Sequence, residues 1–257
     1  MRIITIYKII LTALFGLYAG SSYSALTVDR SRLVFNEGEK SVSLNVTNRN
    51  LNDPYLAQGW MEDGNEKKLT GLLMVLPPVQ RVEAGGKTMI RIQALPDVSA
   101  LPKDRESVFY FNLREIPPKS NKKNVLTLAM QSRLKVFYRP ALLKVDPMAD
   151  SVPGASTLTL TRKGKQYQLN NPTPYYFSFV ELRSSPEGKG LDNFEPVMVP
   201  PRGSVTLAPS ATMMGTTPVM MFVNDYGSQR LLPFHCASST CKAGEPTPVP
   251  KPVGGSS

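Results

Sequence analysis

The chain has 257 residues, 41% of them hydrophobic, and its 30 lysines and arginines exceed its 20 aspartates and glutamates to give a net charge of +10. This length and apolar content allow one or two domains with a buried core. A basic chain can bind nucleic acid, but here the cations are scattered, with no arginine-rich helix or aromatic–basic ladder, so we expect a solvated basic surface and no nucleic-acid partner.

The first 24 residues have the features of a Sec-type signal peptide. Arg2 and Lys8 supply positive charge, Ile9–Ala19 is an uncharged apolar run, and small residues precede a cleavage site after Ser24. The alternative is an uncleaved membrane anchor, which needs about 20 apolar residues, more than this run offers. We therefore expect an exported protein, and removal of two cations and no acid lowers its net charge from +10 to +8.

Segments with apolar residues at alternate positions follow from Ala25 onward, separated by turn residues and without a convincing helical stretch. This alternation is typical of strands that bury one face. Seven or so strands at a spacing of about 8–12 residues indicate an immunoglobulin-like sandwich, which we assign to residues 25–142. Its expected strands are 26–28 with 32–35, 41–46, 54–61, 72–76, 87–92, 107–113 and the segment that ends at Pro140.

The last of these segments, 124–140, is unusually long for a strand. Its even positions are apolar from 126 to 138 except for Ser132, and Pro140 ends the strand because proline has no N–H to donate. From the pattern alone, a place in the buried core is favoured over an exposed edge that pairs with another chain, since apolar strand residues usually lie inside. The apolar positions are Leu126, Leu128, Met130, Leu134, Val136 and Tyr138.

The alternation lapses after Pro140, and residues 143–153 are predicted to form a hinge. A second all-β unit is expected over residues 154–242, with turns between its strands. Residues 243–257 are rich in proline and glycine, which predicts a disordered tail. The expected strands of the second unit are 156–161, 166–169, 175–182, 204–207, 219–223 and 230–234.

Cys236 and Cys241 are the only cysteines. In an exported chain they favour a disulfide, here closing a short loop after the last strand. The alternative is a metal site that also uses His235, but two thiolates and one imidazole fall short of the four ligands that zinc prefers. The sequence lacks a nucleophile elbow, a phosphate-binding glycine loop and a paired-histidine motif, so we expect no enzyme, cofactor or metal.

Five segments, in the same order along the chain, resemble motifs of the periplasmic chaperones of the chaperone–usher pilus pathway, in particular those of the P-pilus type. The longest segment is 101–118, and the resemblance covers Ala25 to about Lys242. The short basic turn at 119–124 is similar to that of the subgroup with a short loop before the donor strand, which usually serves rod-like pili. Ser31 replaces a threonine of the nearest motif. The other matching segments are 29–32 with 34–35, 135–140, 171–176 and 224–227.

The resemblance implies two immunoglobulin-like β-sandwich domains in an L, in the periplasm, with a pilus subunit bound in and along the cleft. A pilin subunit is a sandwich that lacks its last strand, and the chaperone lends its own strand to fill the groove. The implied donor residues are Leu126, Leu128 and Met130, and their two-residue spacing suits this role because alternate side chains point into one groove. This reverses the core assignment for the three. The apolar positions from 134 on share their parity, so the strand must twist or bulge, or its packing must change, between the two sets.

The resemblance also implies the partners and the polar sites. Arg32 and Lys135 match the family's cleft pair, which binds the subunit's C-terminal carboxylate through charge-assisted hydrogen bonds; without the motifs they would be assigned as solvated surface cations. Glu106, Arg139 and Asp225 match an ion-pair network that orients the domains. The implied partners are pilin or fimbrial subunits and the adhesin, the outer-membrane usher, and a second copy of the chain in a self-capping dimer when free. Residues that match the family's usher-facing surface are Leu56, Gln58, Pro78 and Arg91.

Two rival classes make different demands on these residues. A secreted two-domain β-sandwich that adheres to a receptor or matrix needs neither Arg32 nor Lys135. A hydrolase built on a serine–histidine–aspartate arrangement would depend on His235, the only histidine.

Overall fold

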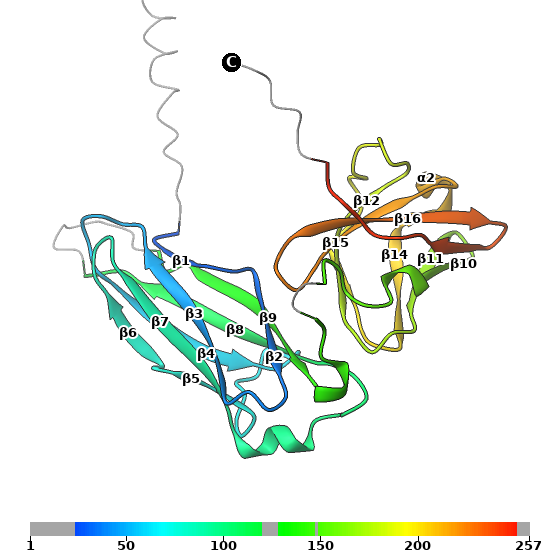
Figure 1. The fold of residues 1–257 in the computed structure, drawn as a ribbon. Coiled ribbons are helices and arrows are strands. Elements are labelled where there is room, and N and C mark those ends of the chain that lie inside the picture. Colours follow the sequence, from blue (N-terminus) through cyan, green and yellow to red (C-terminus); the bar gives the residue numbers. More distant parts are fainter. Residues whose placement is uncertain (1–23, 120–127, 147–148, 251–257) are drawn as a thin grey trace, which may run out of the picture.

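The structure is a computed structural model that describes residues 24–119, 128–146 and 149–250 (Figure 1). These residues are almost entirely β and form two sandwiches, set at an angle and joined after Pro140, which confirms the predicted fold class. None of the helices in them is long and apolar enough to cross a membrane. The predicted signal peptide, up to residue 23, lies outside the described residues.

The N-terminal sandwich packs a four-stranded sheet, in the order β1-β3-β7-β5, against a five-stranded sheet, β2-β9-β8-β4-β6. Alternate residues of the facing strands, such as Leu44, Ile90, Phe111 and Val136, are buried between the sheets. β2 and β9 run parallel, whereas the other neighbours in this sandwich are antiparallel. The strands are β1 (Leu26–Val28), β2 (Arg32–Asn36), β3 (Ser41–Asn48), β4 (Tyr55–Glu62), β5 (Leu73–Leu76), β6 (Val79–Val82), β7 (Lys87–Ala94), β8 (Ser107–Ile116) and β9 (Gln131–Arg139).

The C-terminal sandwich is a single path of strands, β13-β12-β15-β16-β17-β10-β11-β14, folded over on itself. β16 belongs to both layers, because its first half pairs with β15 and its second half with β17. Phe177, Phe179 and Phe222 pack ring against ring inside, with Phe234 also buried. The strands are β10 (Thr159–Lys163), β11 (Gln166–Asn171), β12 (Phe177–Arg183), β13 (Val197–Val199), β14 (Gly203–Ser210), β15 (Val219–Val223), β16 (Gln229–Ala237), β17 (Thr240–Ala243) and β18 (Thr247–Pro248).

Short helical turns connect the strands. One α-helical turn follows β14, with Ser210 as its N-cap residue accepting a hydrogen bond from the Met213 N–H. A 3-10 turn directly after Pro140 begins the connection between the sandwiches. The helical segments are α2 (Ala211–Met214), η1 (Pro96–Ala100), η2 (Ala141–Leu143) and η3 (Ala155–Thr157).

The structure corrects the prediction of disorder from residue 243 for the part of the tail that it describes. Ala243 completes β17, and Thr247 and Pro248 form β18, which pairs antiparallel with β16. Proline removes a backbone donor only at alternate positions here, so an edge strand can still form. Residues 251–257 lie outside the described residues.

Cys236 and Cys241 form the predicted disulfide, which joins β16 to β17 at directly opposite positions. Loop entropy makes such a short cross-link worth about 2 kcal/mol. We expect replacement of both cysteines by alanine to lower the free energy of unfolding by about that amount. Chemical denaturation measures the change, and thiol titration of the unfolded exported protein should find no free thiol; two free thiols would refute the assignment.

Candidate functional site

A pair of cations lies where the N-terminal sandwich approaches the C-terminal one. Arg32 on β2 and Lys135 on β9 are directly opposite in the parallel register. Leu33 and Val136, the next residues on these strands, are buried in the core, so both cations leave the sheet on its other face. Figure 1 shows β2 and β9 on the side of the N-terminal sandwich next to the C-terminal domain.

Each cation donates one hydrogen bond across to the C-terminal domain. Arg32 Nη1 donates to the carbonyl oxygen of Val223, 2.9 Å away, and Lys135 Nζ donates to Ser178 Oγ, 3.1 Å away. Arg32 Nε is buried without a hydrogen-bond partner among the described residues. Within those residues neither cation forms an ion pair, so their donor capacity is only partly used.

Both cations have pKa values below their usual range. Burial lowers the pKa of Lys135, and the neighbouring charge of Arg32 lowers it further. Burial likewise lowers the pKa of Arg32, and the negative charge of Asp225 only partly opposes this. An anion with two acceptor oxygens would relieve the repulsion and use the unpartnered donor, so the pair has the chemistry of a carboxylate site.

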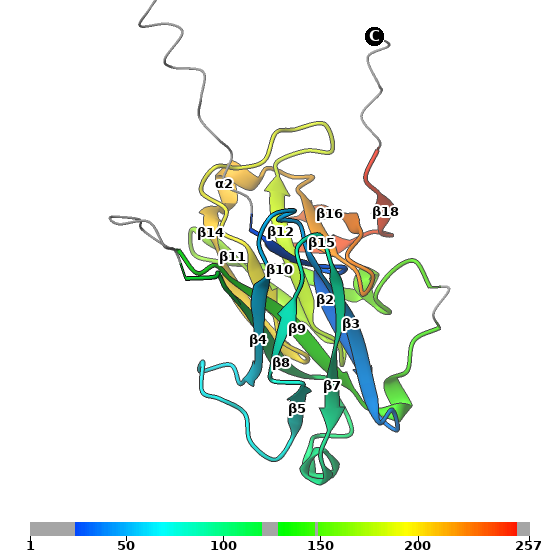
Figure 2. The same cartoon turned by 90° about the vertical axis from the view of Figure 1, so that its left-hand side faces the viewer.

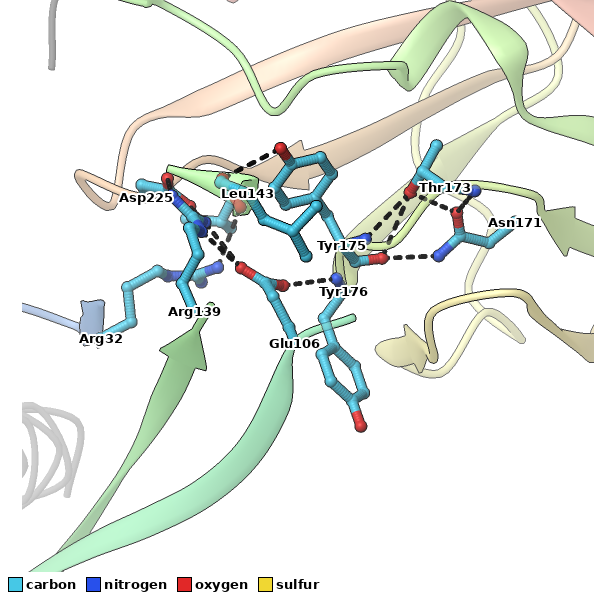
Figure 3. A network of polar contacts seen from close by, with 10 residues as sticks. Arg32, Glu106, Arg139, Leu143, Asn171, Thr173, Tyr175, Tyr176 and Asp225 are labelled. Carbon is cyan, nitrogen blue, oxygen red and sulfur yellow. Dashed lines mark hydrogen bonds and ion pairs between the residues drawn. The ribbon is translucent and has the colours of Figure 1, made fainter. Parts of the chain in front are cut away.

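A buried ion-pair network lies next to this pair (Figure 3). Arg139, at the end of β9, binds Glu106 of the N-terminal domain and Asp225 of the C-terminal domain, with shortest N···O distances of 2.7 Å to each. Glu106 and Arg139 are each 3% exposed. Burial raises the pKa of Glu106 and the charge of Arg139 partly opposes this, whereas burial lowers the pKa of Arg139 but hydrogen bonds to Asp225 and the charge of Glu106 outweigh it. The three residues predicted to form an interdomain network are thus in contact.

The segment after β11 contacts this network through the ring of Tyr175 and the backbone N–H of Tyr176. Asn171 holds the turn, because its Nδ2 donates to the carbonyl oxygen of Tyr175 and its Oδ1 accepts from the Thr173 hydroxyl. The Tyr176 N–H then donates to Glu106 Oε2 at 2.7 Å. The polar residues of the 171–176 motif therefore place a backbone N–H of the C-terminal domain against the buried carboxylate of Glu106 in the N-terminal domain (Figure 3).

The turn between β15 and β16 approaches the N-terminal domain closely. Asn224 Oδ1 accepts hydrogen bonds from the backbone N–H groups of Tyr226 and Ser228, which fixes the turn that carries Asp225. Gly227 has φ +83°, and a Cβ at this position would lie 2.8 Å from the side-chain oxygen of Ser31. The backbone conformation therefore favours glycine, whereas the Ser31 hydroxyl could rotate away from a larger side chain.

Replacing Glu106 by glutamine tests how much the network contributes to stability. The amide keeps the shape but removes the charge opposite Arg139 and one hydrogen-bond acceptor, so we expect the free energy of unfolding to fall by about 1–3 kcal/mol. Denaturant titration measures it. Arg81→Ala is the control, because that exposed pair with Glu83 should contribute nothing measurable; equal effects of the two substitutions would contradict a special role for the buried network.

The apolar segment before β9 is exposed. Leu128 is 67% exposed and Met130 is 50% exposed, whereas Leu134 and Val136 are buried; Leu126 lies outside the described residues. β9 begins at Gln131, so the prediction of a continuous strand from residue 124 is wrong for the described residues 128–130. The register of β9 against β8 runs without a shift from Gln131 to Tyr138, with Leu134 and Val136 buried, whereas Leu128 and Met130 lie before the strand begins.

One edge of β9 is open beside these exposed side chains. β2 pairs with β9 only from Lys135 onward, and the described residues provide no partner on that edge for residues 131–134. On the other edge, β8 pairs with β9 from Gln131, and the Glu115 N–H still donates to the carbonyl oxygen of Met130. An open strand edge with alternate apolar side chains is a site where another chain can add a strand.

The four residues predicted to face the usher come from the opposite edge of the same domain. Leu56 and Gln58 share one face of β4, and the Gly59 N–H donates to the carbonyl oxygen of Pro78, which directly precedes β6. Arg91 lies on β7 in the other sheet, directly opposite Leu76 of β5. The sequence reasoning missed three further features: the exposed side chain of Val79 beside this edge, and the two C-terminal partners of the cations, Ser178 and Val223.

Comparisons with known proteins agree with this arrangement. Residues 25–144 match the family model described as pili and flagellar-assembly chaperone, PapD N-terminal domain, and residues 153–233 match pili assembly chaperone PapD, C-terminal domain. The chain is 43% identical over 235 residues to chaperone protein PapD of Escherichia coli, covering 91% of this chain and 96% of that protein. It is 42% identical over 225 residues to the probable fimbrial chaperone YfcS of E. coli K12, covering 88% of each.

Solved structures give the same result. The Pseudomonas aeruginosa CupB2 chaperone superimposes with a TM-score of 0.68 and 31% identity, covering 82% of this chain and all of that one (100%). The periplasmic chaperone SfaE gives a TM-score of 0.64 and 30% identity, covering 79% of this chain and 95% of that one.

Proposed function

The chain belongs to the pilus-assembly chaperones of the chaperone–usher family, and we propose that it captures pilus subunits by lending them the open edge of β9 together with Leu126, Leu128 and Met130. The family works in the periplasm, and solved complexes of its members with a pilin and with a tip subunit exist. A secreted adhesion protein is not favoured by these matches.

The observation that carries the proposal is that three features meet at the start of β9. Residues 131–134 have an edge without a partner among the described residues, Leu128 and Met130 just before the strand are exposed, and Lys135 lies where pairing with β2 begins. An incoming strand would find backbone partners, two apolar anchors and a cation in line. Few surfaces combine unpaired edge groups with exposed large apolar side chains, because such edges aggregate.

Arg32 and Lys135 would hold the subunit's C-terminal carboxylate and so fix the register of the added strand. Support comes from their adjacency, the absence of an ion-pair partner among the described residues and the unpartnered Nε of Arg32. Register matters because a shift by one residue would turn every side chain of the added strand to the wrong face. The Glu106–Arg139–Asp225 network would keep the two walls of the cleft at a fixed angle.

Further partners follow from the same assignment. We include delivery to the outer-membrane usher through the surface of Leu56, Gln58, Pro78 and Arg91, and a self-capping dimer through the donor edge when no subunit is bound. Export by a signal peptide cleaved after Ser24 completes the proposal.

Co-expression tests it most directly. The mature chain is produced in the periplasm with the pilin subunit encoded beside its gene, and we expect a soluble one-to-one complex, with the subunit aggregating when the chain is omitted. A subunit that stays soluble and monomeric without the chain, or never co-purifies with it, contradicts the proposal. A secreted adhesion protein would not depend on the cleft cations, so its receptor binding should survive the substitution Lys135→Ala. Loss of subunit binding in this variant therefore distinguishes a chaperone from the adhesion protein.

A further inference from the structure

The C-terminal sandwich carries an apolar surface on its outer face, which we call the apolar wall: Val180 of β12, Val219 and Met221 of β15, and Leu231 of β16. These side chains alternate with the core phenylalanines and leucines of the same strands, so they point away from the core. Three of them are nevertheless buried, with exposures of 3% for Val219, 5% for Met221 and 8% for Leu231.

The chain's own C-terminal tail covers this wall. Val249 packs against the cluster, and Thr247 and Pro248 pair with Leu231 and Arg230 at the edge of β16. Figure 2 shows β18 next to β16, and in Figure 1 the red terminal segment lies on the side of the sandwich toward the N-terminal domain. The tail is thus an extra edge strand whose one apolar side chain lies on the wall.

The wall is continuous with the cation site. Ser178 and Val223 lie two positions from Val180 and Met221 on the same strands, and therefore on the same face. These two residues accept the hydrogen bonds of the cleft cations. In the register Val223 is opposite Gln229, so β18 lies two strands from it, about 10 Å away. The covered surface is the C-terminal wall of the cleft.

The cover is weakly attached. Prolines at 246, 248 and 250 have no N–H, so only Thr247 and Val249 can donate from this stretch, and Thr247 and Pro248 are exposed. Pairing with β16 involves two residues only. The prolines also keep the segment extended before it attaches, which reduces the entropy lost on reattachment and partly offsets the small number of hydrogen bonds.

We propose that residues 246–250 are an internal cover that a bound pilus subunit displaces, and that the apolar wall beneath is a second contact for an apolar segment of that subunit. This inference rests on the proposed function of the cleft. A surface that is free in only a fraction of the molecules binds with an affinity lowered by that fraction. If about one molecule in ten is uncovered, the cover weakens subunit binding about tenfold.

Truncation provides the main test. A chain ending at Glu245 loses the cover, whereas a matched control ending at Pro250 keeps it and loses only residues 251–257. We expect the chain ending at Glu245 to bind the fluorescently labelled pilin encoded beside its gene about tenfold more tightly than the control. Equal or weaker binding overturns the cover while leaving the proposed function intact, and absence of binding to both chains overturns both.

A cross-link provides the opposite perturbation and serves if the truncated chain fails to fold. Leu231 and Thr247 are directly opposite, so Leu231→Cys combined with Thr247→Cys should form a disulfide that locks the cover in place. The oxidised variant should bind the pilin at least tenfold more weakly than the same variant after reduction, with wild type under the same reductant as control. Equal binding of the two forms overturns the proposal.

Hydrogen exchange distinguishes displacement from mere proximity. In the free wild-type protein the amide of Thr247, which is opposite Leu231, should be protected, and saturation with the pilin should remove that protection. Protection that persists in a saturated complex overturns the proposal, even though subunit capture itself would then be demonstrated.

Discussion

Alanine at Lys135 or Arg32 is expected to remove most subunit capture while leaving the fold intact. Each side chain makes one hydrogen bond to the C-terminal domain and has no counter-ion among the described residues, so its loss should barely change the melting temperature. In the complex, however, a desolvated carboxylate would be left short of a donor, which costs about 2–5 kcal/mol. The dissociation constant should therefore rise by at least about thirtyfold.

Titration of the pilin against both single variants and the double variant measures this effect. The two losses should not add, because both cations serve one carboxylate. Amidating the C-terminus of a peptide that copies the subunit's last strand should mimic either substitution and add little to it. Arg162→Ala, which removes an exposed cation from β10, is the control. An amidated peptide that binds wild type as tightly as the free acid would disprove the anchor without touching the family assignment.

Glutamate at Leu128 is expected to give a folded protein that no longer protects subunits. The side chain is 67% exposed in the free chain, so a charge there should cost little folding free energy. In the subunit groove the same carboxylate would lose its hydration without gaining a partner, at a cost of about 4 kcal/mol or more. Binding should weaken by about a thousandfold.

The matched control is Leu142→Glu, since Leu142 is 89% exposed and lies on η2, outside the donor segment. Circular dichroism and melting temperature establish folding, and co-purification measures capture. A Leu128→Glu protein that unfolds would show that Leu128 belongs to the core. One that still yields soluble complex would show that another strand is donated.

The strands that the sequence predicted well are those in which alternation and burial coincide. β3 and β7 alternate cleanly, and their inward residues, such as Leu44 and Ile90, are completely buried. Alternation gives the parity of a face but not whether anything covers it. Leu128 and Leu134 share a parity and differ in burial, because β9 begins only at Gln131, between them. The apolar pattern runs through this boundary, so it does not show where the strand begins.

Very short strands and pairings between distant segments could not be predicted from the local sequence pattern. β6 and β13 have four and three residues, too few to show a period, and were not predicted. β18 was assigned to disorder because its composition is proline-rich, and only the neighbouring edge of β16 makes it a strand. The adjacency of Arg32 and Lys135 depends on a parallel register between distant segments, so the sequence indicated it only through the resemblance to a known family.

The parallel pairing of β2 with β9 also determines when the cleft can form as the chain folds. It joins segments roughly a hundred residues apart. Bringing the two cations together therefore costs the entropy of closing a loop that contains nearly the whole domain. Antiparallel neighbours such as β8 with β4 close smaller loops and should be ordered earlier. Pulse-labelled amide exchange during refolding should therefore find β2 among the last strands protected. A newly exported chain would then be unable to bind a subunit through its two cations until its N-terminal domain has folded. Subunits would therefore be bound only by fully folded chains.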